Sequence, residues 1–364
     1  MPKTNTKIVA AKPKTANGNG NKTLSCTSET SLTEMQMLEM YRFVKMTRMF
    51  DEKTVAMKRQ SKIVGGVFSS LGQEATAVGT AYALETQDFI APLIRDLGAV
   101  LVKGIEPRHI FASYMARSAA PNRATDLQFH FADFERGFIG PISHLGDMIP
   151  VLAGVLLASR MKKERRVGVA YVGDGTTSTG AFHEGVNFAA VQKLPLITVI
   201  ENNCYAYSTP TRLQTACAEF VEKAAGYGIR GFSVDGNDII ACYETMKKAV
   251  ELARNGESIL IEAKTYRRKG HAEHDNQSYC PDGEIDFWAA NNDPIDRYER
   301  FLIEQKIAVQ EKLNEIATGI TAFLNAEADW AESSPAPEPE TAAYNVFDNS
   351  IVPPAFKRKI FGGN

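Results

Sequence analysis

The stretch Val167-Gly-Val-Ala-Tyr-Val-Gly173-Asp174-Gly175 decides the fold of this chain. It is a short apolar run with β-favouring residues, and it ends in two glycines that flank an acid. A second run, Leu196-Ile-Thr-Val-Ile200, follows after a segment long enough for one helix. Both runs are apolar almost throughout, which is typical of parallel strands covered on both faces.

Strand and helix patterns alternate between residues 163 and 265. Strands are predicted at 167–172, 196–200, 232–234 and 258–263, and helices at 181–192, 215–227 and 239–253. This alternation predicts an α/β fold with a doubly wound, mostly parallel sheet and helices on both faces.

The chain divides into three parts by composition. Residues 1–30 are polar and rich in Lys, Asn, Gly and Thr, which predicts a flexible N-terminal tail. A single domain is expected over 31–330, opening on the capping-box pattern Ser31-Leu-Thr-Glu34 and a long first helix. Residues 331–364 contain a run rich in Pro and Glu and are interpreted as a linker followed by a C-terminal arm.

Composition excludes several classes of function. With 364 residues and 44% hydrophobic content the chain can fill a large core, and its net charge of −2 gives no field to attract nucleic acid or an anionic membrane. No apolar run reaches the roughly 18 residues expected of a membrane span. The five cysteines have no paired spacing, which favours a reducing compartment. We expect a cytoplasmic location, because the first forty residues contain no Arg and do not favour a mitochondrial transit peptide.

Polar residues follow the two strands that define the fold. Gly173 and Gly175 would let the backbone approach a phosphate group, and Asp174 lies between them. Because the carboxyl ends of neighbouring parallel strands share one edge, Asn203 is expected beside Asp174. The Asp174 carboxylate, the Asn203 amide oxygen and the Tyr205 carbonyl are hard oxygen ligands of the kind Mg²⁺ prefers. The alternative is a glycine-rich turn with a capping Asp.

The sequence Gly-Asp-Gly, 26 further residues and then Asn202-Asn203 resembles the thiamine diphosphate motif. Residues 35 to 330 are also similar to the α subunits of pyruvate and branched-chain 2-oxo acid dehydrogenase E1 components. The similar segments are Leu71-Gly-Gln-Glu-Ala75, Asp88-Phe-Ile-Ala-Pro-Leu-Ile-Arg-Asp96, Ile142-Ser-His-Leu-Gly-Asp-Met-Ile-Pro150, Asn203-Cys-Tyr-Ala-Tyr-Ser-Thr-Pro-Thr211, Val234-Asp-Gly-Asn-Asp238 and Ala263-Lys-Thr-Tyr-Arg-Arg-Lys-Gly-His271.

This resemblance implies thiamine diphosphate and Mg²⁺ as cofactors and assigns residues to them. Arg95 and Arg267 would hold the diphosphate, Leu145 would lie against the aminopyrimidine, and His271 would reach the cofactor as the catalytic residue. The implied cofactor-binding residues are Arg95, Ser143, Leu145, Gly173, Asp174, Gly175, Thr176, Asn203, Arg267 and His271. The implied metal ligands are Asp174, Asn203 and Tyr205.

Other polar residues have structural interpretations that compete with a role in the site. A histidine such as His271 is by itself more typical of a surface loop, and the roles of His144 and His274 stay open. Gln73 and Glu74 open an apolar helix, where we expect a buried cap and packing. The histidines expected to be structural or on the surface are His109, His130 and His183.

Three positions depart from the family pattern. Ile94 precedes Arg95 where many relatives have a tyrosine, so one diphosphate contact is expected to be missing. Phe68 lies where pyruvate-specific relatives often have a histidine near the substrate. Ala272 replaces the serine that is a kinase target in mammalian enzymes, so phosphorylation control is not expected at that position.

The resemblance implies a subunit that needs a partner. In this family a β subunit supplies the Glu that activates the cofactor, so an α2β2 heterotetramer is expected to decarboxylate a 2-oxo acid and pass the acyl group to the lipoyl arm of an E2 acyltransferase. The substrate would be pyruvate or a branched-chain 2-oxo acid. Three alternatives stay open: an acetoin dehydrogenase α subunit, a transketolase-like enzyme and a catalytically inactive scaffold subunit.

Overall fold

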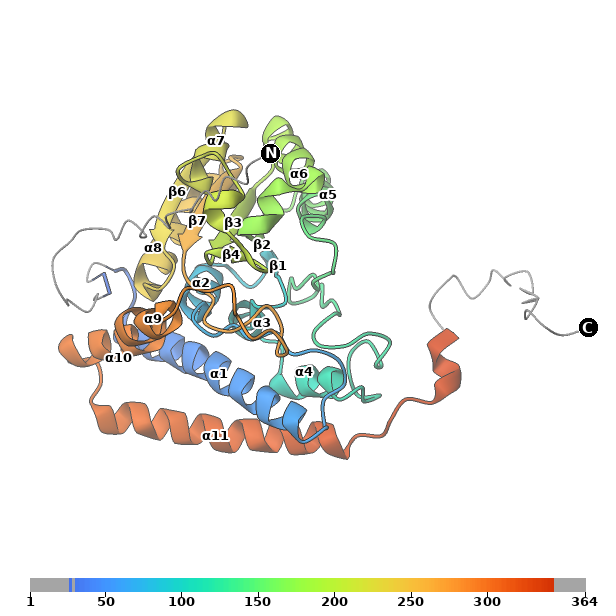
Figure 1. Ribbon diagram of the computed structural model, residues 1–364. Coiled ribbons are helices and arrows are strands. Elements are labelled where there is room, and N and C mark those ends of the chain that lie inside the picture. Colours follow the sequence, from blue (N-terminus) through green and yellow to red (C-terminus); the bar gives the residue numbers. More distant parts are fainter. Residues whose placement is uncertain (1–25, 28–29, 344–364) are drawn as a thin grey trace, which may run out of the picture.

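The centre of the structure is a five-stranded parallel sheet (Figure 1). A computed structural model gives this architecture and describes residues 26–27 and 30–343. The strand order is β1-β2-β3-β7-β6, and β4 and β5 form a separate antiparallel hairpin. The strands are β1 (Phe89–Ala91), β2 (Gly168–Gly173), β3 (Leu196–Asn202), β4 (Tyr205–Ala206), β5 (Thr209–Pro210), β6 (Arg230–Asp235) and β7 (Ile259–Lys264).

Helices and 3-10 turns connect these strands. The helices are α1 (Glu34–Arg59), α2 (Glu74–Tyr82), α3 (Leu97–Val102), α4 (Pro107–Tyr114), α5 (Met148–Met161), α6 (Gly180–Gln192), α7 (Lys223–Gly226), α8 (Ile239–Arg254), α9 (Glu284–Asn292), α10 (Pro294–Glu304) and α11 (Gln310–Ser333). The 3-10 turns are η1 (Asp174–Ser178), η2 (Thr211–Leu213), η3 (Phe220–Glu222) and η4 (Pro339–Ala343).

Helices cover both faces of the sheet, as the apolar strands predicted. In β2, Val169 and Tyr171 point into one core cluster, whereas Ala170 and Val172 point into another. Helices α5 and α6 cover the second face, and α2, α3 and α8 cover the first (Figure 1). Each fully buried aliphatic side chain contributes about 1.5–3 kcal/mol to this packing. The prediction of a doubly wound α/β fold is confirmed.

Helix α11 forms the outer layer, where it packs against α4 and α1 (Figure 1). Its residues Ile320, Leu324 and Ala328 join the same core cluster as β2 and β3. Because α11 continues to Ser333, the predicted boundary between 330 and 331 falls inside this helix. The remainder of the predicted C-terminal arm, residues 344–364, lies outside the described residues.

The start of the chain differs from the sequence prediction. Most of the predicted tail lies outside the described residues, but Cys26 is buried, and the backbone N–H and hydroxyl of Thr27 both donate to Asp238 Oδ2, at 2.7 and 2.8 Å. The capping box is formed by Thr33 and Gln36, not by Ser31 and Glu34, so α1 begins at Glu34. The Ser31 side chain instead donates to Glu244.

The helix predicted over residues 215–227 is also wrong in extent. Only η3 and the four-residue α7 form there, and the chain leaves α7 through Gly228, whose φ is +67°. The Glu262 side chain accepts a hydrogen bond from the Val221 N–H at 2.9 Å. A side chain from β7 therefore takes a backbone donor in the middle of the predicted helix, a contact that the periodicity of the sequence does not reveal.

Candidate functional site

The tips of β2 and β3 meet at one edge of the sheet. Gly173 is paired in register with Glu201, so Asp174 and Asn203 follow the ends of adjacent parallel strands. Both side chains are buried, with 2% and 6% exposure. A Cβ on Gly175 would lie 2.5 Å from the Cβ of Ala206, so this close approach of the two tips requires glycine.

Hydrogen bonds orient the Asp174 carboxylate. The Gly175 N–H donates to Oδ1, and the Gln214 Nε2 donates to Oδ2, both at 2.9 Å. Burial raises the pKa of the Asp174 carboxyl, which these donors and the charge of Arg267 oppose. Neighbouring Gly173 has no atom within 4 Å of the position a Cβ would take, so open space adjoins the backbone before Asp174.

Asn203 and Tyr205 present oxygen atoms at the end of β3. Asn203 donates from Nδ2 to Gln73 Oε1 at 2.9 Å, and its Oδ1 accepts from the Tyr205 N–H at 3.3 Å. Between them Cys204 has a φ of 76°, which turns the chain sharply. The Tyr205 carbonyl accepts a long bond of 3.4 Å from Arg267 Nη1.

This donor set suits Mg²⁺ by its chemistry. One carboxylate, one amide oxygen and one backbone carbonyl are hard ligands, and Mg²⁺ takes its remaining ligands from water and phosphate. The described residues contain no group of three or more His, Cys, Asp or Glu that could hold a metal ion. A softer ion such as Zn²⁺ has no such ligand set in this part of the chain.

Two guanidinium groups, of the buried Arg267 and the half-buried Arg95, lie at this end of the sheet. Arg267 donates to the Tyr207 carbonyl at 2.6 Å and to the Tyr279 hydroxyl at 2.5 Å, whereas Arg95 donates to the His271 carbonyl. Among the described residues no carboxylate lies within ion-pair distance of either group. Burial, and then the charge of Arg267, lower the pKa of Arg95 to about 10. Two guanidinium groups without an ion-pair partner, one of which lowers the pKa of the other, are suited to an anionic ligand.

The His271 imidazole lies beside these cations. Its ring is 4.5 Å from that of Tyr207 and 5.8 Å from that of Phe68. Its backbone N–H donates to Asp275 Oδ2 at 2.6 Å, which fixes the loop. Burial, Arg95 and Arg267 lower the pKa of His271 to about 4, so the ring is neutral near pH 7.

Comparison with known proteins identifies the family of the chain. A family described as "Dehydrogenase E1 component" matches residues 41–340. The chain belongs to the dehydrogenase E1 component family. It is similar to the 2-oxoisovalerate dehydrogenase subunit alpha of Bacillus subtilis, with 36% identity over 87% of this chain and 96% of the relative.

Relatives with other named substrates align over the same extent of this E1 chain. The subunit alpha of acetoin:2,6-dichlorophenolindophenol oxidoreductase from Cupriavidus necator is 33% identical, over 87% of this chain and 95% of the relative. The pyruvate dehydrogenase E1 component subunit alpha of Porphyra purpurea is 31% identical, over 88% of this chain and 96% of the relative. The family resemblance seen in the sequence is confirmed, and the substrate is left open.

The E1 chain places two predicted site residues at the rim. Ser143 and Leu145 are exposed, Leu145 by 51%, on the loop before α5. This loop lies against η1, because a Cβ on Gly146 would be 2.6 Å from Thr179 Oγ1 and 3.3 Å from Thr176 Cγ2. Thr176 itself is buried. Asp174 and Gly175 belong to η1, which ends at Ser178, so α6 begins only at Gly180 and not directly behind the glycine turn.

Sequence reasoning missed several residues of this site. Gln214 orients Asp174, Tyr207 stacks near His271, and Tyr279 with Asp275 supports Arg267. Gln73, expected to cap and pack, bonds to Asn203 instead of capping α2 within the described residues. Gln73 and Tyr207 lay inside segments that resemble the family, and no spacing marked the others.

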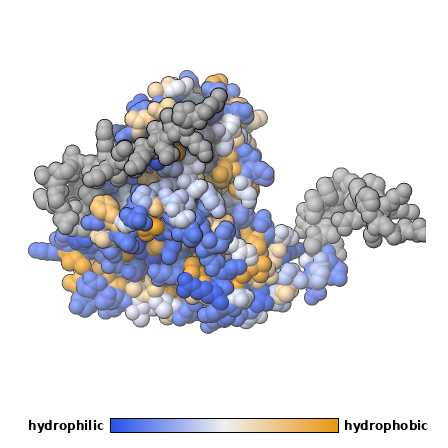
Figure 2. Space-filling view, in the orientation of Figure 1, coloured by the Kyte–Doolittle hydropathy of each residue, from blue (hydrophilic) through white to orange (hydrophobic). Residues whose placement is uncertain are grey.

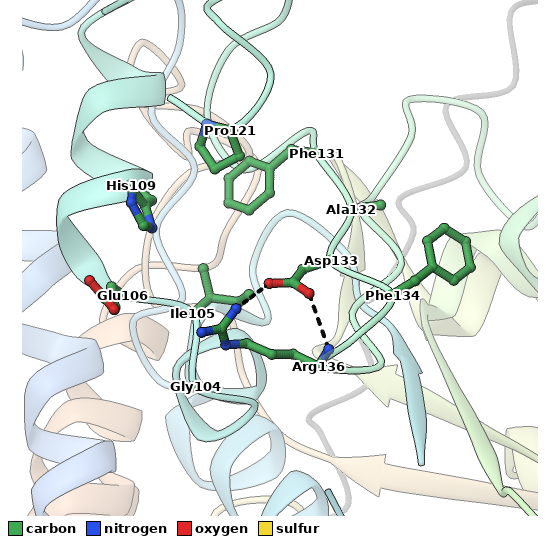
Figure 3. A pocket seen from close by; sticks show the side chains of 10 residues that line it. All are labelled: Gly104, Ile105, Glu106, His109, Pro121, Phe131, Ala132, Asp133, Phe134 and Arg136. Carbon is green, nitrogen blue, oxygen red and sulfur yellow. Dashed lines mark hydrogen bonds and ion pairs between the residues drawn. The ribbon is translucent and has the colours of Figure 1, made fainter. Parts of the chain in front are cut away.

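A surface pocket elsewhere does not include the site. It has a volume of about 280 Å³ and lies beside α4 and the loop of residues 131–136 (Figure 3). His109 and Asp133 line it, and Arg136 there pairs with Asp133 at 2.5 Å (Figure 3). None of the predicted cofactor or metal residues lines this pocket.

The face in Figure 2 is mostly hydrophilic with small separate hydrophobic patches. None of the helices in residues 26–27 and 30–343 combines the length and the hydrophobicity of a membrane-spanning segment.

Proposed function

We propose that this chain is the α subunit of the E1 component of a 2-oxo acid dehydrogenase complex and that it binds thiamine diphosphate through Mg²⁺. The observation that carries the proposal is the pair Arg95 and Arg267, which have no carboxylate partner among the described residues and lie beside the strand tips. A diphosphate would neutralise both cations. The hard oxygen atoms of Asp174, Asn203 and Tyr205 would hold the Mg²⁺ ion between protein and phosphate.

The remaining site residues have defined tasks in this proposal. Gly173 and Gly175 leave room for the backbone to approach the diphosphate, with Thr176 in the following turn. Ser143 and Leu145 border the site as a polar and an apolar contact for the aminopyrimidine. When bound, thiamine diphosphate would supply the carbanion chemistry that a 2-oxo group requires.

His271 is the proposed catalytic residue. A neutral imidazole can accept a proton or donate its own N–H, whereas an imidazolium can only donate. Burial, and then the charges of Arg95 and Arg267, lower the pKa of His271 and keep it neutral, while the rings of Phe68 and Tyr207 border the imidazole. We therefore assign it to proton exchange and charge stabilisation next to the reacting atoms.

Partners complete the activity. The rim loop with Leu145 is open to solvent, which suits a second subunit that covers the cofactor. We propose an α2β2 heterotetramer in which the β subunit provides the activating carboxylate, and an E2 lipoyl acyltransferase that accepts the acyl group as its disulfide is reduced. The five free cysteines support a reducing, cytoplasmic location.

The proposed substrate is a branched-chain 2-oxo acid. Two relatives at 36% identity are named for 2-oxoisovalerate and 3-methyl-2-oxobutanoate dehydrogenases, against 31% for the pyruvate enzyme of Porphyra purpurea. The apolar Phe68 beside His271 suits an aliphatic substrate side chain. An acetoin dehydrogenase α subunit is the second candidate, because relatives with that name reach 33% and 32% identity.

Reconstitution tests the proposal. The chain is purified alone and after co-expression with a β-type partner, and 2-oxo acid-dependent reduction of an artificial electron acceptor is measured with Mg²⁺ and thiamine diphosphate. We expect activity only from the assembled protein, with 3-methyl-2-oxobutanoate preferred over pyruvate and acetoin. Full decarboxylase activity from the isolated chain would contradict the subunit assignment, and a preference for acetoin would establish the second candidate.

A further inference from the structure

Gln73 makes a contact that its position on a helix does not explain. It precedes α2 and is only 1% exposed, yet in the described chain its side chain makes no capping hydrogen bond. Instead its Oε1 accepts from Asn203 Nδ2 at 2.9 Å, across 130 residues of sequence. Its own Nε2 has no hydrogen-bond partner among the described residues. Within the described part of the chain, this buried side chain therefore makes one hydrogen bond, with Asn203.

This contact determines which end of the Asn203 amide faces the proposed metal. The Tyr205 backbone N–H donates to Asn203 Oδ1 at 3.3 Å, so Oδ1 lies on the side of the turn that also carries Tyr205. Gln73 Oε1 can only accept, so it holds Nδ2 on the opposite side. A reversed amide would set its NH₂ group against the Tyr205 donor and direct N–H groups to the cation.

The backbone around Gln73 holds its side chain in place. The preceding Gly72 has a φ of +96°, and a Cβ there would lie 2.4 Å from the Tyr266 carbonyl oxygen. Thr265 Oγ1 donates to the Gly72 carbonyl at 2.9 Å, and the Arg268 N–H donates to the Leu71 carbonyl at 3.1 Å. The segment is therefore fixed against the chain that follows β7, and Gln73 is directed at Asn203 in advance of any ligand.

We propose that Gln73 is a positioning residue that holds the Asn203 amide with Oδ1 turned to the Mg²⁺ of the site. The inference rests on the proposed function and adds a residue to it. Groups that orient a metal ligand typically contribute about 10- to 100-fold to metal affinity. Packing alone, the role expected from sequence, does not require the Oε1 acceptor.

The test is a Mg²⁺ titration by calorimetry of the full chain assembled with its β partner, at a fixed saturating concentration of thiamine diphosphate. Gln73→Met keeps the length of the side chain but removes the acceptor, and we expect its apparent Kd for Mg²⁺ to rise about 10- to 100-fold. Gln73→Glu keeps an acceptor for the Asn203 N–H, and it is expected to recover most of the affinity. At saturating Mg²⁺ the kcat of Gln73→Met should return close to the wild-type value.

Two further variants separate positioning from packing. Ser70→Ala removes a buried hydrogen bond to Asp51 in the same loop without contacting Asn203, and it should leave the apparent Kd within about threefold of wild type. In Asn203→Asp both ends of the side chain are oxygen atoms, so its orientation no longer matters. Adding Gln73→Met to this variant should therefore change the apparent Kd for Mg²⁺ little in a double-mutant cycle. If Gln73→Met does not fold, we expect Gln73→Ala to show the same rise in the apparent Kd for Mg²⁺.

Three results have distinct meanings. A Gln73→Met protein that binds Mg²⁺ as tightly as wild type would overturn the positioning role. An equal loss of Mg²⁺ affinity in Ser70→Ala would assign the effect to loop stability and overturn the positioning role. The same loss on adding Gln73→Met to Asn203→Asp would have the same meaning. A wild-type assembly that binds neither Mg²⁺ nor thiamine diphosphate would refute the proposed function itself, which is a different outcome.

Discussion

The guanidinium of Arg95 donates a hydrogen bond from Nη2 to the backbone carbonyl oxygen of His271, although the two residues are 176 positions apart. This bond joins a proposed diphosphate-binding group to the loop that carries the proposed catalytic imidazole. Arg95 also lies over the Phe68 ring at 5.7 Å, and that ring meets His271 edge-on. Anion binding and imidazole placement are therefore linked in one contact network.

Replacing Arg95 with Met should weaken the cofactor site in two ways. Loss of a hydrogen bond to a charged group costs about 1.5–3 kcal/mol, so thiamine diphosphate affinity should fall about 10- to 100-fold in calorimetry. Hydrogen exchange of residues 269–279 should accelerate, because the loop loses its contact with Arg95. Arg108→Met, which removes an ion pair with Glu327, is the matched control and should change neither measurement. Unchanged affinity in Arg95→Met would exclude a phosphate contact.

The neutral state of His271 predicts a pH dependence of stability. Its pKa is about 4 in the folded chain against an ordinary value of 6.5. Between these values the unfolded chain binds a proton that the folded chain does not, so this group makes unfolding easier as pH falls from 6.5 to 4. Above pH 6.5 the imidazole is neutral in both the folded and the unfolded chain, so its effect on the free energy of unfolding no longer changes with pH.

Urea denaturation of the cofactor-free wild type and of His271→Asn tests this sign. The wild-type free energy of unfolding should decline relative to that of the variant as pH drops through this window, and the two should run parallel above it. Parallel curves over the whole range would show that His271 is not desolvated. In the assembled enzyme the same substitution should lower kcat about 100-fold or more, as removal of a general acid–base group does.

Much of this fold could be predicted from local pattern, and the limits have a physical cause. The runs that became β2 and β3 are apolar almost throughout because both of their faces are buried, and their tips carry Asp174 and Asn203. The three-residue β1 was not predicted, because it is too short to show a period. A period-based helix over 215–227 failed where Glu262 took the Val221 backbone donor.

The polar contacts of the site were harder to predict than the strand tips. Gln73 reaches Asn203 across 130 residues, and Gln214 reaches Asp174 across 40. Both contacts depend on loop paths that tertiary packing sets, such as the positive φ of Gly72. A glutamine before an apolar helix carries no local mark of such a partner, so packing was the expectation for Gln73.

Gly175→Ala should separate the two strand tips. The added Cβ would lie 2.5 Å from the Ala206 Cβ, well inside normal contact, and overpacking of this kind costs about 1–3 kcal/mol. Thermal unfolding of the chain should show the loss, and cofactor affinity should fall with it. Gly226→Ala is the control, because nothing lies within 4 Å of its added Cβ and the position is helical. A Gly175→Ala chain of unchanged stability would contradict the close approach.

Asp174→Asn should separate folding from metal binding. The amide has nearly the volume of the carboxylate, and its Oδ1 can still accept from the Gly175 N–H. Its NH₂ end can donate to Gln214 Oε1, which has no hydrogen-bond partner among the described residues, once the Gln214 amide turns over, and a buried charge is removed. The cofactor-free chain should thus be at least as stable as wild type. Because a ligand is weakened directly, Mg²⁺ affinity should fall by more than the roughly 100-fold upper range typical of residues that only orient a ligand. Retained Mg²⁺ affinity in calorimetry would place the ion elsewhere.

Phe68→His tests whether the aromatic neighbour of His271 contributes to substrate choice. The Phe68 ring meets the His271 ring in an edge-on contact at 5.8 Å, so it lies next to the atoms where a 2-oxo acid side chain is expected. An imidazole there is smaller and polar, which disfavours an aliphatic side chain and accommodates a short one. A methylene group in an apolar pocket is worth about 10- to 200-fold in kcat/KM. The ratio of kcat/KM for 3-methyl-2-oxobutanoate to that for pyruvate should therefore fall at least about tenfold in the assembled enzyme.

Phe134→His, at an exposed position outside the site, should leave the ratio unchanged. If Phe68→His lowers both kcat/KM values equally, the ring supports His271 without selecting the substrate, because a supporting residue affects every substrate alike.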